Sequence, residues 1–415
     1  MQKKNLSAIA FLILTALYIA GCASSSRFSS NEGKSTLSNQ FTGNLIKVLL
    51  NDTRRELSFN LQSPVILYEN EKPIALIKTG NRLNFFSAGN GLELKIQSRI
   101  FNAGYFILKP DNKEEGIKYD GVRYGGVIKI TGGDNSVNVI NQVPLELYLK
   151  GVMAREMPMG KGDSYFQALK AFAICARTYA ISKLGKGHLF DIYLDTRDQV
   201  YGGLSSERQL GNKAVDETQN MILTYDGRPA VIFYSASCGG HTANVKEVFP
   251  GNDEPYLQGV KDGDLPNCSI APHFNWEEKY SANKFIKRLE IAGYLERGIY
   301  TLRNVIVENR SPSGRVAELL VKVISDNGQE KNVTINGNKI RTVIRKSDDS
   351  NILQSTMFDV NFDGENVLIK GRGNGHGVGL CQWGAIYQST QGKDYKDILS
   401  FYFPGTVIKE FNDKE

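Results

Sequence analysis

Apolar and polar residues alternate along the chain from about residue 44 to residue 143, between turns rich in asparagine, aspartate and glycine. Seven segments there fit short strands with one buried face: IKVLL, VILYE, IALIK, LELKI, GYFILK, GVIKI and VNVI. The same alternation returns between residues 303 and 370, in NVIVENR, LLVKVI, NVTI and VLIKG. This pattern predicts two regions of antiparallel β-sheet.

After residue 143 the apolar period lengthens to about 3.6 residues, which predicts a helix. Pro144 suits the first turn of this helix, and Leu149 and Val152 lie on its apolar face. Glu156 continues the same face, and Pro158 stops the helix directly after it. Because an apolar surrounding disfavours the charged form of a carboxyl group, Glu156 is a candidate acid.

A second helix is predicted from about residue 164 to residue 183, because Ser164 and Gln167 have the spacing of a capping box. Gly185 follows its end, as is typical of a helix C-terminus. Shorter helices are predicted over residues 210–219, 281–293 and 382–402. Central helices between two β regions indicate an α+β fold.

The N-terminus has the features of an export signal. Two lysines precede an apolar run over residues 6–20, which is short for a membrane-spanning helix. The run ends at Ala20-Gly21-Cys22, an order that resembles a bacterial lipobox, in which the cysteine receives the lipid. We therefore expect a lipoprotein signal peptide over residues 1–21 and an exported protein that Cys22 anchors to a membrane facing the cell wall, in the periplasm or on the outer surface.

Composition divides the rest of the chain. Residues 22–42 are rich in serine, asparagine and glycine, which indicates a flexible tether. We expect a β-rich region over residues 43–135 and a catalytic domain over residues 136–411. Removal of residues 1–21 deletes two lysines and no acid, so the formal charge falls from +6 to +4. No basic block with interleaved aromatic residues is present, which argues against nucleic-acid binding.

Two cysteines and two histidines lie close together in the sequence: Cys238, His241, Cys268 and His273. This set could hold a structural zinc ion through two sulfurs and two nitrogens. A Cys238–Cys268 disulfide is the preferred alternative, because export favours oxidised cysteines and the spacing is not that of paired zinc knuckles.

The most unusual segment is the glycine-rich loop over residues 371–379, GRGNGHGVG. Its glycines let a ligand approach the backbone closely, but it lacks the Lys-Ser/Thr pair of a phosphate loop. His376 in this loop, followed by Gln382 and Trp383, suits a saccharide cleft in which the indole stacks on a sugar ring. The alternative is a glycine-rich turn in which the histidine only caps the backbone.

Several motifs together resemble the stage II sporulation protein D (SpoIID/LytB) family. They are VPLELYLKGVMAREMP from Val143, QALKAFAICARTYA from Gln167, QVYG from Gln199, FYSASCGG from Phe233 and GHGVGLCQWGA from Gly375. Shorter matches at residues 313–315, 355–358 and 403–406 follow in the family's order, so the resemblance covers about residues 120–411.

Characterised members of this family are lytic transglycosylases, and the resemblance implies the same activity here. Such enzymes cleave peptidoglycan glycan strands between MurNAc and GlcNAc and leave 1,6-anhydro-MurNAc ends. The family's essential glutamate corresponds to Glu156, which would act as acid and then as base. This chemistry needs one carboxylate rather than the two of ordinary glycoside hydrolysis, and it requires no cofactor. Sporulation relatives prefer strands denuded of stem peptides, and a role in sporulation or cell division is implied.

The resemblance also implies a set of substrate contacts beside the acid. These are Arg177, Tyr179, Tyr201, Tyr234, Ser235 and His376, to which the loop analysis adds Gln382 and Trp383. Some members bind zinc through Cys and His just before the Gln-Val-Tyr motif. This chain has Leu194, Arg197 and Asp198 in that region, so we do not expect that metal site here.

Two other classes of function stay open. One is a non-catalytic wall-binding protein that recruits or stimulates an amidase, which would keep the cleft and tolerate loss of Glu156. The other is a zinc-dependent amidase built on the Cys/His set. It is the weaker of the two, because cysteine-rich ligation suits structural zinc.

Overall fold

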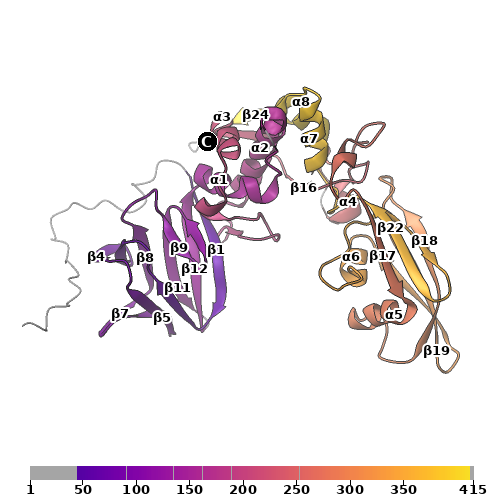
Figure 1. The fold of residues 1–415 in the computed structure, drawn as a ribbon, viewed down its shortest axis with the longest axis horizontal. Coiled ribbons are helices and arrows are strands. Elements are labelled where there is room, and N and C mark those ends of the chain that lie inside the picture. The colour runs from indigo at the N-terminus through magenta and orange to yellow at the C-terminus, as the bar shows by residue number, and fades with distance from the viewer. Residues whose placement is uncertain are drawn as a thin grey trace, which may run out of the picture. The chain divides into compact units, whose positions relative to one another are not determined.

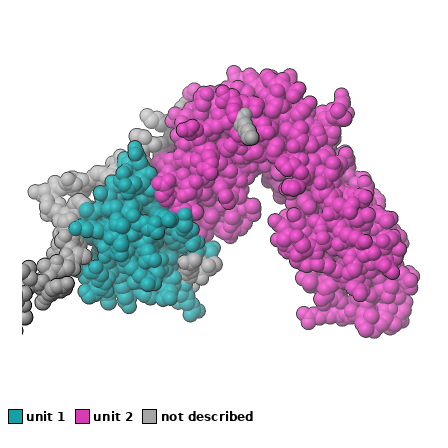
Figure 2. Space-filling view, in the orientation of Figure 1, with its two compact units in different colours: residues 1–40, 51–121, 125–141 teal, residues 41–50, 122–124, 142–415 magenta. Residues whose placement is uncertain are grey.

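A computed structural model describes residues 44–411 except residues 90, 134, 161, 188 and 252. The expected signal peptide, the lipidated Cys22 and the tether lie outside these residues. Within the described part of the chain, no helix is both long and apolar enough to cross a membrane. The described chain forms two compact units (Figure 2): residues 51–121 and 125–141 belong to unit 1, and residues 44–50, 122–124 and 142–411 to unit 2.

Unit 1 is built of antiparallel strands, as the alternating pattern predicts. One sheet has the order β2-β5-β6-β7, and neighbouring strands of another have the order β12-β11-β8-β3-β4. Apolar residues such as Leu83, Phe85 and Leu94 point to the buried side and polar ones to the other. The strands are β2 (Glu56–Asn60), β3 (Val65–Glu69), β4 (Lys72–Ile77), β5 (Arg82–Ala88), β6 (Gly91–Ile96), β7 (Arg99–Ala103), β8 (Tyr105–Pro110), β9 (Ile117–Tyr119) and β11 (Val127–Gly133).

Strands β1 (Leu45–Arg54) and β12 (Ser136–Pro144) run from one unit into the other, and β10 (Val122–Tyr124) belongs to unit 2. Helix α1 (Leu145–Glu156) follows β12 directly. It ends at Glu156, as predicted, but Pro144 precedes its first turn as the N-cap residue. The helix buries Tyr148, Leu149 and Val152.

Helix α2 (Phe166–Lys183) corrects the predicted start. The chain enters it through a 3₁₀ turn over Gly162–Tyr165, and no side chain caps its first turn. Distant partners occupy the expected capping box: the Ser164 carbonyl accepts a hydrogen bond from Ser389, and the Gln167 side chain accepts one from the N–H of Tyr395. A helix packed on all sides does not depend on a local cap.

Helix α1 and three later helices of unit 2 gather around α2 (Figure 1). The helix expected over residues 382–402 is in fact two, because Gly392 takes a positive φ of 81° and Asp394 caps a new helix. The three later helices are α3 (Gln209–Glu217), α7 (Gln382–Thr390) and α8 (Tyr395–Tyr402). The short strands of this part of unit 2 are β13 (Ile192–Tyr193), β14 (Met221–Tyr225), β15 (Arg228–Pro229), β16 (Tyr234–Ser235), β23 (Leu380–Cys381) and β24 (Val407–Glu410).

The later part of unit 2 holds a second β region with its own core. Sheets β17-β22-β21 and β18-β19-β20 share this core with two helices. The segment over residues 339–344, which the strand pattern did not single out, is helical. The elements are β17 (Asn275–Ser281), α5 (Ala282–Ile291), β18 (Tyr300–Arg310), β19 (Val316–Ser325), β20 (Glu330–Asn336), α6 (Lys339–Ile344), β21 (Phe358–Phe362) and β22 (Asn366–Arg372), with α4 (Val245–Val248) before them.

Candidate active site

Glu156 ends helix α1 at the wall of a pocket of about 650 Å³. The pocket belongs to unit 2 and combines segments far apart in the sequence, from α1 to the glycine-rich loop. Of the predicted site residues, six line it: Glu156, Tyr179, Tyr234, Ser235, His376 and Gln382. The helix end thus places a half-buried carboxylate at a cavity wall.

The Glu156 carboxyl group is tied to the chain through one oxygen. The backbone N–H of Val200 donates a 2.6 Å hydrogen bond to Oε1, and Gln382 Nε2 donates a 2.9 Å bond to the Glu156 main-chain carbonyl. Burial raises the pKa of Glu156, while the Val200 N–H and the charge of Arg155 lower it by less. The protonated form is therefore favoured relative to that of an ordinary glutamate.

Two short parallel strands form the wall that faces this carboxyl. Tyr234 and Ser235 of β16 pair with Leu380 and Cys381 of β23, and Gln382 follows directly. Burial, and then the charge of Glu156, raise the pKa of Tyr234 well above its usual value. Tyr234 therefore keeps its proton and presents a neutral hydroxyl close to Glu156.

His376 lies in the glycine-rich loop with its ring beside a stacked pair of aromatic side chains. Phe233 and Phe249 meet it edge-on, with ring centroids 6.0 Å and 5.2 Å away. Burial, followed by the charges of Arg341 and Arg315, lowers the pKa of His376 to about 3. The imidazole is therefore neutral, and its Nδ1 accepts a hydrogen bond from the N–H of Val378.

A second carboxylate, Asp198, reaches the pocket but is fully engaged. It accepts hydrogen bonds from the Tyr179 hydroxyl at 2.5 Å and from the Tyr193 N–H at 2.8 Å, and it pairs with Lys183. Asp198 thus orients Tyr179 and contrasts with Glu156, which has no such set of donors.

The pocket is also lined by cationic and amide side chains that were not among the predicted site residues. Arg197, Arg341 and Lys346 line it, together with Gln354 and Asn374. They come from separate loops and from α6, so no motif joins them. Their long side chains can bind an anionic, hydroxyl-rich ligand.

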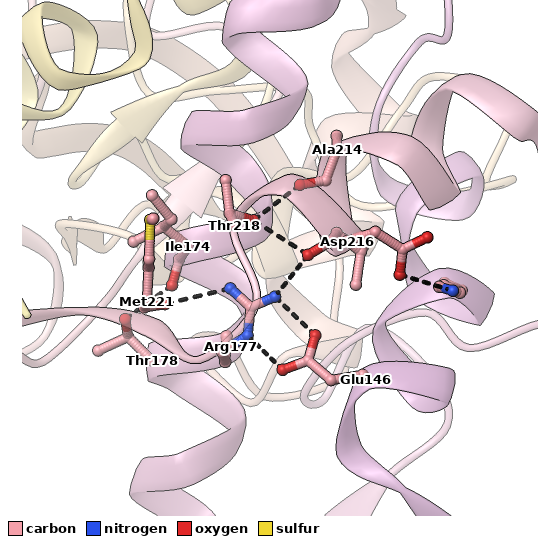
Figure 3. Close-up of polar contacts among 10 residues, drawn as sticks. Glu146, Ile174, Arg177, Thr178, Ala214, Asp216, Thr218 and Met221 are labelled. Carbon is pink, nitrogen blue, oxygen red and sulfur yellow. Dashed lines mark hydrogen bonds and ion pairs between the residues drawn. The ribbon is translucent and has the colours of Figure 1, made fainter. Parts of the chain in front are cut away.

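Arg177 does not line the pocket, which corrects its expected role as a substrate contact. Its side chain is fully buried, and both Nε and Nη2 donate to the Glu146 carboxylate, at 2.8 Å and 2.7 Å (Figure 3). The remaining bonds go to the carbonyls of Met221 and Val215. These bonds use four of the five guanidinium N–H groups inside the core, so Arg177 links α1, α2 and α3.

Tyr201 and Trp383 are also placed outside the lining of this pocket. The Tyr201 ring is 3% exposed and packs on Tyr148 and Tyr124, with ring centroids 4.9 Å and 5.7 Å apart. Trp383 is half-buried at the start of α7, where its backbone N–H donates a hydrogen bond to the Ala236 carbonyl. Neither side chain is therefore part of the pocket lining.

The expected disulfide is not formed. Cys238 and Cys268 are free, and their sulfurs lie 3.6 Å apart, whereas bonded sulfurs lie about 2.0 Å apart. The two histidines of the alternative zinc set also stay away: His241 Nδ1 contacts the Thr242 carbonyl at 2.7 Å, and His273 is exposed. Close spacing along the chain did not produce closeness of these four side chains in space.

A larger hollow of about 950 Å³ lies elsewhere in unit 2, beside Trp276 and Phe358. Its carboxylates are ion-paired, as in Asp264–Lys261 at 2.8 Å and Glu277–Lys370 at 3.2 Å. These carboxylates are exposed and ion-paired, unlike the half-buried Glu156.

The fold and the pocket define an α+β protein with a partly buried helix-end glutamate in a polar and aromatic cavity. The family described as "Stage II sporulation protein" matches residues 133–225, which include α1, α2 and the Val200 loop. A domain of unknown function matches residues 266–379. The chain is 31% identical to stage II sporulation protein D of Bacillus subtilis, over 65% of this chain and 76% of that protein.

The chain belongs to the stage II sporulation protein D family. It is also 30% identical to an uncharacterised protein of Brachyspira hyodysenteriae, over 89% of this chain and 94% of that protein. A third relative is the amidase enhancer of Bacillus subtilis, with 28% identity over 79% of this chain and 51% of that protein. The chain therefore spans about half the length of the amidase enhancer.

Proposed function

We propose that this protein is a lytic transglycosylase that cleaves peptidoglycan glycan strands, with Glu156 as the acid and then the base. The observation that carries the proposal is the position of Glu156, half-buried at the pocket wall with one oxygen tied to Val200. Membership of the stage II sporulation protein D family supports it.

The hydrogen bond from Val200 decides which oxygen carries the proton. An N–H can only donate, so Oε1 is the acceptor and the acid proton resides on Oε2. That proton passes to the oxygen of the MurNAc–GlcNAc bond as the bond from MurNAc C1 breaks. The MurNAc 6-hydroxyl oxygen then bonds to C1, and its proton returns to Glu156. No water is consumed, and the carboxyl ends in its starting state.

The charge of the pocket favours denuded strands. A MurNAc without its stem peptide has a free lactyl carboxylate, whereas peptide attachment converts that group to an uncharged amide. Arg341 and Lys346 line the same pocket as Glu156 and can pair with such a carboxylate. Neutral His376 and Tyr234 are suited to hydrogen-bonding sugar hydroxyls.

The test compares the full-length chain with its Glu156→Gln variant on intact peptidoglycan and on glycan freed of stem peptides by an amidase. Products are analysed by mass spectrometry for 1,6-anhydro-MurNAc ends. Glu330→Gln, which changes an exposed glutamate of β20, is the matched control. We expect anhydro ends from the parent and the control, and a loss of at least about 10²-fold with Glu156→Gln. Equal product from all three would refute the proposal.

A second candidate is stimulation of a cell-wall amidase, and the similarity to the amidase enhancer over 79% of this chain supports it. This role needs the pocket surface but no acid. It predicts that the parent and Glu156→Gln accelerate a purified amidase equally while neither makes anhydro ends.

A further inference from the structure

Three cysteine sulfurs and one carboxylate meet in the interior of unit 2. Cys238 follows β16, Cys268 lies in the 3₁₀ helix Asn267–Ile270, and Cys381 ends β23. Their Sγ atoms and an oxygen of Asp262 all lie within 4.8 Å of one another, and all four residues are buried. We propose that these residues bind one zinc ion in a structural, tetrahedral site.

The spacing of the sulfurs fits ligands of one ion. Cys238 Sγ and Cys268 Sγ lie 3.6 Å apart, too far for a bond between them. Two sulfurs that each lie about 2.3 Å from a zinc ion at a tetrahedral angle are about 3.8 Å apart. Thiolate-rich sets select soft or borderline metals such as zinc over calcium or magnesium.

Asp262 gives the site an anionic fourth ligand without a cationic partner. It is fully buried, and none of the ion pairs of the described residues includes it. The Tyr402 hydroxyl donates to Oδ1 at 2.7 Å, and the Cys268 N–H donates to Oδ2 at 3.0 Å. A buried carboxylate beside three thiols is costly unless a cation offsets its charge. The two donors still leave lone pairs for a metal and hold the carboxylate in place.

The groups that surround the four proposed ligands are also suited to a metal site. The Cys238 N–H donates to Cys381 Sγ at 3.2 Å, a bond that a thiolate accepts well. Buried Arg315 donates to the carbonyls of Cys238 and His241, which adds positive charge next to the anionic ligands. Gly384 makes room, because a Cβ there would lie 2.7 Å from Asp262 Oδ1 and 2.1 Å from the Tyr402 hydroxyl oxygen.

Four protein ligands leave no open position, so the ion would be structural rather than catalytic. Its place in the fold indicates what it holds. Cys381 is the last residue of β23, and Cys238 lies three residues after β16. This strand pair forms the wall that carries Tyr234, Ser235 and Gln382. Zinc would therefore fix that wall of the pocket, whichever reaction the pocket performs.

The test starts with the full-length chain, purified with reductant and without chelators. Zinc, iron and copper are measured by mass spectrometry of the elements, and the thiols by titration with a mercurial while a dye detects zinc release. We expect about one zinc ion per chain, released as the cluster thiols react. Less than about 0.1 zinc per chain even after added zinc, or copper or iron in its place, would overturn the assignment. So would a Cys238–Cys268 disulfide in protein purified without oxygen.

Variants and a spectrum then assign the ligands. Cys381→Ser should retain less than about a fifth of the zinc, and Asp262→Asn should weaken zinc binding by about 10–100-fold. Cys175→Ala, a buried cysteine of α2 outside the cluster, is the matched control and should keep full zinc. Because a variant can fail to fold, cobalt is also loaded into the parent chain. An intense thiolate-to-cobalt charge-transfer band supports the site, and cobalt binding without that band overturns it.

Discussion

The backbone N–H of Val200 donates a 2.6 Å hydrogen bond to Oε1 of Glu156, although 44 positions separate the two residues. The bond ties the end of α1 to the loop before Tyr201 and favours the ionised carboxylate. Burial opposes it and is the larger effect, so the pKa of Glu156 is raised. The contact therefore orients the acid without making it a permanent anion.

The first prediction concerns the pH dependence of strand cleavage. A general acid must be protonated, so activity falls as pH rises through the pKa of Glu156. Because burial raises that pKa, the fall should lie above 4.5, the ordinary value for glutamate. The measurement is kcat/KM for anhydro-end formation from about pH 4 to pH 9. A fall centred at or below the ordinary value would contradict the assignment.

Glu156→Gln should also change stability in a pH-dependent way. A raised pKa in the folded state means that folding disfavours the ionised form, so stability is lost as pH rises through the folded pKa. Glutamine cannot ionise and can still accept the Val200 hydrogen bond. The variant should match the parent at pH 4 and exceed it at pH 8 by about 0.5–2 kcal/mol in urea unfolding. An equal or lower stability at pH 8 would argue against a desolvated carboxylate.

His376 should make the fold sensitive to mild acid. Its pKa is lowered to about 3 in the folded protein from an ordinary value of 6.5, so the unfolded chain binds the proton first. Stability is then highest above pH 6.5 and declines as pH falls toward 3. His376→Asn should remove about 1–2 kcal/mol of the stability difference between pH 7 and pH 5. An unchanged difference would show that the imidazole is protonated in the folded state.

Arg177→Ala should lower the stability of the fold rather than weaken substrate binding. It removes the donors to the Glu146 carboxylate and one donor each from the carbonyls of Met221 and Val215. We expect a loss of about 3–5 kcal/mol in the free energy of unfolding, measured with urea. Arg228→Ala, at an exposed position of β15, should change it by less than about 0.5 kcal/mol. Normal stability with lost activity in Arg177→Ala would restore the substrate role.

Gly151→Ala tests how closely α1 packs on the core. Alanine is the better helix former by about 1 kcal/mol, yet a Cβ at Gly151 would lie 2.5 Å from a ring carbon of Tyr201. Overpacking should outweigh propensity and cost about 1–3 kcal/mol. A second change, Tyr201→Leu, should recover part of that loss in the double variant, measured by thermal unfolding. Gly133→Ala, where nothing lies within 4 Å of the new Cβ, is the control.

Local patterns predicted the elements that carry the candidate acid. Pro144 and Pro158 bracket α1, and the apolar period places Glu156 on its buried face, so both are visible in a short window of sequence. The strands of the two β regions follow from period-two alternation for the same reason. The predicted capping box of α2 was wrong because a distant residue replaced the local hydrogen-bond partner: the Gln167 side chain accepts from the N–H of Tyr395.

The partners of side chains depended on contacts between distant segments. Arg177 has an ordinary place in its motif, but α3 and Glu146 surround it and remove it from the pocket. Cys238 has His241 three residues away, but its neighbours in space are Cys268, Cys381 and Asp262.

The sequence by itself thus determined the secondary structure around Glu156, its family and the residue expected to act as acid, because periodicity, prolines and motifs act over a few neighbouring positions. Only the tertiary structure decided which groups share the pocket and which cysteines meet. Burial, charge pairing and metal-ligand distances depend on segments that come together only when the chain packs.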